Sequence, residues 1–225
     1  MKKLTISKLL EFRGKSANGK KRFVERVKSP VVEAPSEGGG HYWITSLSAI
    51  SNSYKKGDSD LVDEKIDELA EKTSASKHTL VKNMYVRNID ILKKFKTLSI
   101  KRIRPAGKIG FLKKSSAISL LTIKGLQIQA SPNHVFTFFK SGKENIGAVW
   151  FVSKLNGYRP EEVGMFTELL YRFLKNGYAK KYDINADYCL VLDVVKGNWV
   201  SYSQLESGSV TQLLIPTLEE INRLM

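Results

Sequence analysis

The sequence has little cysteine, little histidine and no long apolar run. Its single cysteine, Cys189, excludes a disulfide within the chain and disfavours a zinc site built on cysteine ligands. The three histidines, at positions 41, 78 and 134, lack the spacing of a metal-binding motif. No apolar stretch reaches the roughly 20 residues that span a bilayer. These absences predict a protein of the reducing cytoplasm that does not engage a membrane.

Acidic residues are scarce in two parts of the chain. The net charge is +15, from 37 basic and 22 acidic residues. Residues 1–30 hold 10 basic and 2 acidic residues, and residues 75–125 hold 13 basic and 1 acidic. Residues 31–74 hold 4 basic and 9 acidic, and residues 126–225 hold 10 of each. Segregated charge of this size favours a polyanionic partner, most simply nucleic acid, although a basic surface also serves solubility.

Hydrophobic periodicity divides the chain into two regions. Residues 1–96 are predicted to be mainly helical, with a loop or linker at 30–40 and amphipathic helices at 5–12, 41–55, 60–72 and 79–96. Residues 97–225 are predicted to form a mixed α/β core with a crossing helix at 160–176 and a last helix opened by a capping box of Thr217 and Glu220. Its strands are expected at 98–103, 117–123, 126–129, 135–139, 148–155, 188–195 and 199–202.

One stretch of this core has the outline of a nuclease motif. Pro132 and Asn133 precede an apolar strand, and Val152, Ser153 and Lys154 close the next one. The helix that follows contains the residues TELLY at 167–171, and the chain opens with LTISKLLEF at 4–12.

These features resemble the PD-(D/E)xK nuclease superfamily, in its RecB-like and CRISPR-associated exonuclease branch. In this resemblance Thr167 takes the position of a glutamine in a Gln-x-x-x-Tyr helix, and residues 4–12 are similar to the opening of such chains. It implies a restriction-endonuclease-like mixed sheet and a cleft marked by Asn133, His134 and Lys154.

Two positions depart from the nuclease pattern. The family's Mg²⁺ is held by two carboxylates, but Asn133 offers one neutral oxygen and the Val152 side chain offers none. We therefore expect a nuclease-like fold without catalysis and without a cofactor. The alternative is an active Mg²⁺-dependent nuclease with relocated acids, for which the nearest carboxylates in sequence are Glu144, Glu168 and Asp193. Candidate catalytic residues under that alternative are Lys154, Glu168 and Asp193.

The basic block supplies the candidate contacts to nucleic acid. Basic residues flank a turn at 105–110, and such a loop can follow phosphates without reading bases. The predicted contacts are Lys101, Arg102, Arg104, Lys108, Lys113 and Lys114. A third possibility is a protein-interaction subunit whose acidic segment, residues 58–71, docks a basic partner.

Overall fold

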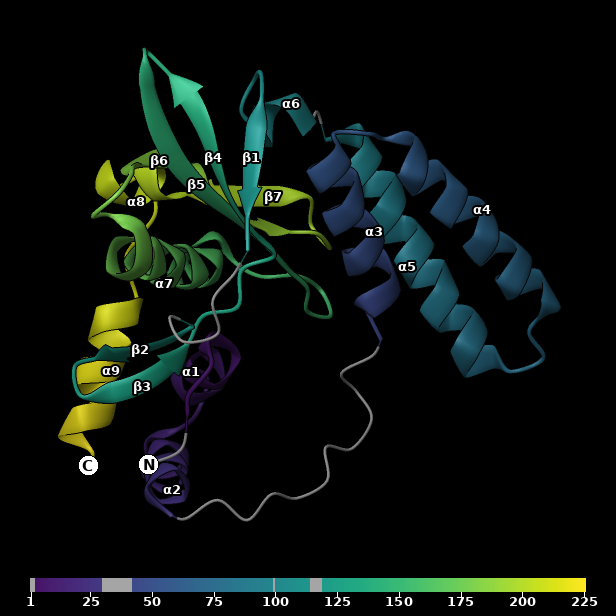
Figure 1. Ribbon diagram of the computed structural model, residues 1–225. Helices are drawn as coiled ribbons and strands as arrows, with labels where there is room; N and C mark the ends of the chain where they lie inside the picture. The colour runs from purple at the N-terminus through teal and green to yellow at the C-terminus, as the bar shows by residue number, and fades with distance from the viewer. Residues whose placement is uncertain (1–2, 30–41, 99, 114–118) are drawn as a thin grey trace.

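The computed structural model describes residues 3–29, 42–98, 100–113 and 119–225 of the 225-residue chain. The loop predicted at residues 30–40 lies outside these ranges. Within them the fold is mixed α/β, with helices at the N-terminus and a five-stranded mixed sheet, as the sequence predicts (Figure 1). Two of the predicted strands form a separate two-stranded sheet. None of the helices in the described ranges has the length and apolar character needed to cross a membrane.

The five-stranded sheet has the strand order β1-β4-β5-β6-β7. Strands β4 and β5 form an antiparallel hairpin, and β5 and β6 are parallel. A parallel pair needs a crossover connection, and helix α7 (Pro160–Tyr178) supplies it as predicted. The strands are β1 (Ile109–Leu112), β4 (His134–Lys140), β5 (Lys143–Val152), β6 (Asp183–Asp193) and β7 (Asn198–Ser201).

Both faces of the sheet are buried, and each faces its own hydrophobic core. Val135, Ala148 and Val191 belong to one core, whereas Phe136 and Val149 belong to the other. Successive strand residues point to opposite faces. Strands covered on both sides are apolar at nearly every position, which is why β5 and β6 contain continuous apolar runs in the sequence.

The first core lies between the sheet and helices from both ends of the chain. Leu4 lengthens the small β2–β3 sheet, because its backbone N–H donates to Gln127 and its carbonyl accepts from Gln129, both at 2.9 Å. Thr5 caps the first helix, its Oγ1 accepting from the N–H of Lys8 at 3.3 Å. The elements on this side are α1 (Ile6–Arg13), α2 (Ala17–Lys28), β2 (Leu120–Ile123), β3 (Leu126–Gln129), α7, α8 (Tyr202–Glu206) and α9 (Leu214–Arg223).

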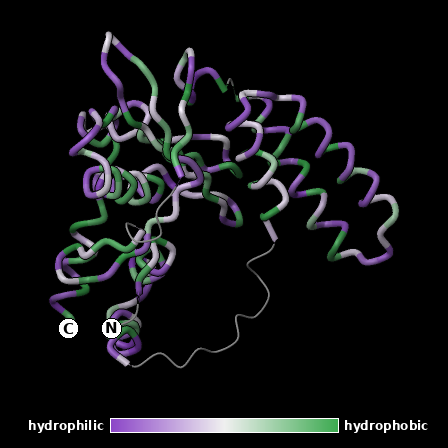
Figure 2. Tube along the Cα trace, in the orientation of Figure 1, coloured by the Kyte–Doolittle hydropathy of each residue, from purple (hydrophilic) through white to green (hydrophobic). Residues whose placement is uncertain are grey.

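The second core joins the opposite face of the sheet to a helical unit of α3 (Ile44–Lys56), α4 (Asp60–Ala75) and α5 (Thr79–Thr97), with the short α6 (Ile100–Ile103). This unit lies beside the sheet in Figure 1, and Figure 2 shows hydrophobic and hydrophilic residues alternating along its helices. The helices expected in residues 1–96 therefore divide between the two faces. Helices α1 and α2 belong to the first core, and α3–α5 belong to the second core on the opposite face of the sheet.

Local corrections concern short segments. Residues 98–103, predicted as a strand, contain α6, because Ile100 and Ile103 are three apart and six residues do not distinguish the helical period from the strand period. Strand β1 was not predicted. Thr217 does not open the last helix. It lies buried inside α9, donates to the Leu213 carbonyl at 2.6 Å and accepts from Arg13 at 3.0 Å.

Candidate functional site

The nuclease-like stretch does bring its two ends together. The Asn133 N–H donates to the Val149 carbonyl at 3.0 Å, and Asn133 Oδ1 accepts from the N–H of Phe151 at 2.7 Å. Asn133 thus continues the β4–β5 pairing with its side chain, close to the point where β5 ends at Val152. Asn133 is thus held beside the end of β5, and one lone pair of its side-chain oxygen is already used by the backbone.

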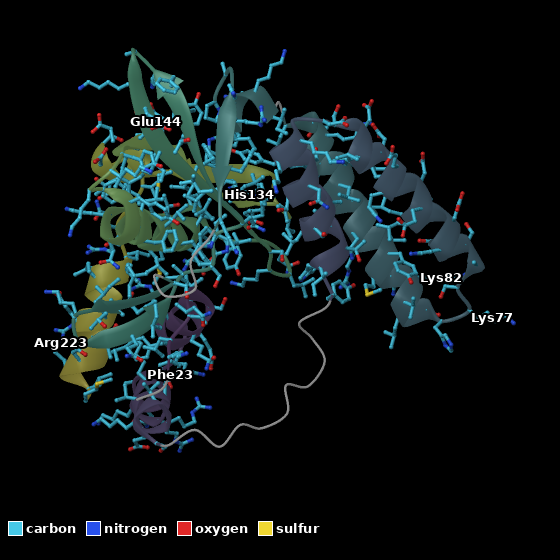
Figure 3. All side chains as sticks on the ribbon, in the orientation of Figure 1. Phe23, Lys77, Lys82, His134, Glu144 and Arg223 are labelled. Atoms are coloured by element: carbon cyan, nitrogen blue, oxygen red, sulfur yellow. The ribbon has the colours of Figure 1, made fainter. Side chains whose placement is uncertain are left out.

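His134 lies on the other side of the sheet, where it contacts α3 (labelled in Figure 3). Its Nε2 is 2.8 Å from Ser51 Oγ and 2.9 Å from the Ser51 carbonyl. Its ring lies parallel to Tyr54, with centroids 5.9 Å apart, and meets Phe111 edge-on at 5.3 Å. Because neighbouring strand residues face opposite sides, His134 does not line the cleft beside Asn133.

Lys154 follows β5 and stands at a cleft between the sheet and α1. Its side chain is 49% exposed, with Nζ 3.8 Å from Glu162 Oε1 and 5.3 Å from the ring centroid of Tyr158. The adjoining cleft, of about 370 Å³, is lined mainly by hydroxyl, amide and aromatic side chains, among them Ser7, Gln129 and Trp150. Val152 also lines it, so the position of the missing second carboxylate faces this space.

Two carboxylates that the sequence analysis did not select lie near Lys154. Glu162 Oε2 accepts from the N–H of Arg159 at 2.8 Å at the start of α7, and Glu11 pairs with Lys15 at 2.8 Å while sharing a cavity with Lys154. In the sequence Glu162 looks only like an acid that stabilises a helix N-terminus. Nowhere in the described ranges do three or more His, Cys, Asp or Glu side chains gather in a way that could hold a metal ion.

Asp193 reaches the same end of the sheet but is engaged by the backbone. It pairs in register with Val152 and is completely buried. Its Oδ2 accepts from the backbone N–H of Tyr158 at 2.6 Å. Its Oδ1 accepts from the backbone N–H groups of Val195 at 3.0 Å and Lys196 at 3.4 Å. Its carboxylate therefore joins the loop that follows Lys154 to the β6–β7 turn.

Gly157 shows how tightly this loop is held. Its φ is +69°, in the left-handed region that favours glycine. A Cβ there would lie 2.6 Å from Asp193 Oδ2 and 2.5 Å from Lys196 Cγ, closer than real Cβ contacts. The loop that carries Lys154 is therefore set by backbone contacts to Asp193.

Glu168 lies on a different side of α7. Phe166, two residues earlier, faces the cleft, and two residues turn a helix by about 200°. Glu168 is buried, its Oε1 accepts from Arg172 Nη2 at 3.0 Å, and its Oε2 has no hydrogen-bond partner among the described residues. It lies near Tyr202, whose pKa is raised mainly by burial and also by Tyr171, Glu206 and Glu168.

The remaining acid, Glu144, lies at the hairpin end of β5 (labelled in Figure 3), where it is paired with Phe139. Ten residues separate it from Lys154, which corresponds to roughly 30 Å along a strand. Of the four acidic and basic candidates, only Lys154 and Asp193 are brought to one end of the sheet.

The predicted basic contacts differ in their surroundings. Lys101 and Arg102 are exposed on α6, with the Arg102 guanidinium 5.2 Å from the ring centroid of Trp199. Lys108 and Lys113 are exposed on either side of β1. Arg104 instead donates from Nε to the Tyr54 carbonyl at 3.0 Å and lies against the end of α3. Lys114 lies outside the described residues.

The basic block keeps most of its charge free of acidic partners. Eleven lysines and arginines are described between residues 77 and 113. Within the described part of the chain only Lys96 among them has a carboxylate within 4.0 Å, from Asp63. Apart from Arg104, which is bonded to α3, these side chains therefore keep a charge that no carboxylate neutralises.

Comparisons with protein-family models, with curated proteins and with solved structures gave no match. Function is therefore inferred from the side chains themselves, their charges and their contacts.

Proposed function

We propose that the protein binds nucleic acid through the phosphate backbone, with weak sequence specificity, and does not cleave it. The observation that carries this proposal is the basic block at residues 77–113, of which only Lys96 is paired with a carboxylate in the described ranges. Lysines and arginines without acidic partners release counterions from a phosphate backbone when they bind it, which drives association without reading bases. We expect this to take place in a reducing cytoplasm.

A nuclease-like ancestry is part of the same proposal. The order of hairpin, crossing helix and parallel strand supports the resemblance to PD-(D/E)xK nucleases. The residues at the corresponding cleft do not fit Mg²⁺, because Val152 supplies no ligand and the Asn133 oxygen is bonded to the backbone. We therefore assign Asn133 and Lys154 to a vestigial cleft and derive no catalytic step.

A salt titration tests the binding. Fluorescence anisotropy with labelled single- and double-stranded DNA and RNA should give an affinity whose logarithm falls linearly with the logarithm of salt concentration. Oligonucleotides of scrambled sequence should bind equally well. Absence of binding to all four substrates at about 50 mM salt would sink the proposal.

One observation favours an active nuclease as a second candidate. Glu162 lies 3.8 Å from Lys154, and Glu11 shares a cavity with it, so relocated acids are near the lysine. Incubation of the same substrates with Mg²⁺ or Mn²⁺ discriminates. We expect intact substrates, whereas cleavage that is lost in Lys154→Ala would replace our proposal with this one.

The acidic segment 58–71 offers fewer free charges than its composition indicates. Glu68 bonds to Lys65 and Lys72, and these bonds lower its pKa to about 2. Asp63 pairs with Lys96. A protein partner docked there would copurify without nucleic acid, and that result would favour the interaction-subunit alternative.

A further inference from the structure

A basic groove, which the sequence analysis did not identify, lies between the helical unit and the sheet. It has a volume of about 290 Å³, and its walls come from α5, from the loop after β5 and from the β6–β7 turn. Arg87 and Lys94 line it from α5, Lys196 lines it from the β6–β7 turn, and Trp43 and Asn156 also face it. Residues 87, 90, 91 and 94 share one face of α5, as their spacing of three or four requires.

The three cations of this groove are held in place by neutral oxygen atoms. Lys94 Nζ donates to the Val195 carbonyl at 2.9 Å, and Lys196 Nζ donates to the Tyr158 carbonyl at 2.9 Å. Arg87 Nη1 donates to the Tyr42 hydroxyl at 3.0 Å. Among the described residues none of the three has a carboxylate within 4.0 Å. Each cation is thus oriented while its charge and its remaining donors stay available.

The charge balance of the groove favours an anion. Against three cations, Asp90 is the acidic residue in its lining. Arg87 and Lys94 are seven residues apart on α5, which places their Cα atoms about 10 Å apart along the helix axis. Cations distributed over this distance suit a polymer with repeated phosphates better than a single small anion.

An aromatic side chain completes the groove. Trp43 lines it and contacts Tyr42 edge to face, with ring centroids 4.5 Å apart. The Trp43 side chain is partly buried against the second core, and the part of it that faces the groove offers a surface on which a base of any identity can stack. Every nucleotide carries both a phosphate for the cations and a base for the ring, whereas the acidic side chains of a peptide use only the cations, so the presence of Trp43 favours a nucleic-acid strand.

We propose that this groove is the principal binding site for a nucleic-acid strand, with Arg87, Lys94 and Lys196 on its phosphates and Trp43 against a base. The proposal rests on the function proposed above and names its site. It also gives the helical unit a role, because the strand would lie between that unit and the sheet.

The test compares two triple variants of the full chain that each lower the net charge from +15 to +12. The groove variant is Arg87→Gln/Lys94→Gln/Lys196→Gln. The control is Lys143→Gln/Lys175→Gln/Lys180→Gln, exposed lysines on elements that do not line the groove. We expect the groove variant to lose at least about tenfold in affinity at moderate salt, with a salt slope smaller by about 2–3. The control should change less than threefold.

Two further measurements keep the result interpretable. Arg87→Lys/Lys94→Arg/Lys196→Arg keeps the charge and should bind within a few-fold of the unmodified protein, which separates lost phosphate contacts from lost folding. Trp43→Ala should weaken binding of a single-stranded oligonucleotide about tenfold and leave binding of inorganic polyphosphate, which has no bases, unchanged.

Three outcomes would overturn the inference. Equal losses of affinity in the groove and control variants would show that binding depends on the overall surface charge and not on the groove, while the proposed nucleic-acid binding would remain supported. Tighter binding of poly-glutamate than of any oligonucleotide would assign the groove to an acidic protein. No binding of the unmodified protein to nucleic acid would remove both the site and the proposed function.

Discussion

At the scale of single residues, Asp193 is the acid whose removal should cost most stability. Its buried carboxylate accepts three backbone N–H groups, which Asp193→Ala would leave without their acceptor. We expect the free energy of unfolding to fall by about 3 kcal/mol. Urea denaturation measures this, with the exposed Asp187→Ala as the control expected near zero. A loss below about 0.5 kcal/mol would mean that the carboxylate does not hold the loop.

Tyr158, in the same loop, should give the protein a specific alkaline pH dependence. Burial raises its pKa from 10.0 to about 12, and its hydroxyl donates to the Ser153 carbonyl at 3.3 Å. Because the neutral phenol is favoured in the fold, its contribution is complete below pH 10 and is lost as the pH rises towards about 12. The difference in unfolding free energy between the unmodified protein and Tyr158→Phe should therefore shrink over this interval. If the unfolding free energies of the two proteins change in parallel with pH, the Tyr158 hydroxyl does not cause the alkaline dependence.

At the scale of elements, the long and strongly patterned segments could be predicted from sequence. The hairpin, α7 and β6 followed from continuous apolar runs and from proline and glutamates at a helix start. Short segments could not, because α6 and β1 have four residues each and their form is decided by tertiary packing. Sequence spacing also located the Asn133–Lys154 end of the sheet. It could not show that Asn133 and Asp193 are already engaged, since their partners are backbone N–H groups. The partner of Glu168 is Arg172, four residues later on α7, a spacing that the sequence does show.

Arg104 was predicted from its charge to contact nucleic acid, but in the structure its side chain is bonded to helix α3. It donates to the Tyr54 carbonyl near the end of α3, where Gly57 adopts φ +73° as the C-cap. A cation at a helix C-terminus is also favoured by the helix dipole. Arg104→Gln should lower the free energy of unfolding by about 1 kcal/mol and leave the salt slope of nucleic-acid binding unchanged. The exposed Lys108→Gln is the matched control for stability. If Arg104→Gln reduces the salt slope of nucleic-acid binding, Arg104 contacts the nucleic acid after all.

At the scale of the whole molecule, the two buried faces of the sheet give the chain two packed bodies with a basic groove at their border. The contact across this border includes the bond from Lys94 to the Val195 carbonyl. The positive charge of residues 75–125 is thus not spread evenly. Part of it lies at the border, part lies on α6 and beside β1, and Lys77 and Lys82 lie at the far end of the helical unit (Figure 3).

This arrangement predicts a pattern of amide hydrogen exchange on binding. A strand held in the groove contacts both bodies, so a saturating single-stranded oligonucleotide should slow exchange in α5 around residues 87–97 and in the β6–β7 turn together. Exchange at the far turn around residues 76–79 should not change, and about 0.5 M salt should abolish the protection. Mass spectrometry of the full chain, with and without oligonucleotide, measures all three regions. Protection confined to residues 100–113 would place the strand on α6 and β1 instead, because only the groove requires both bodies to respond at once.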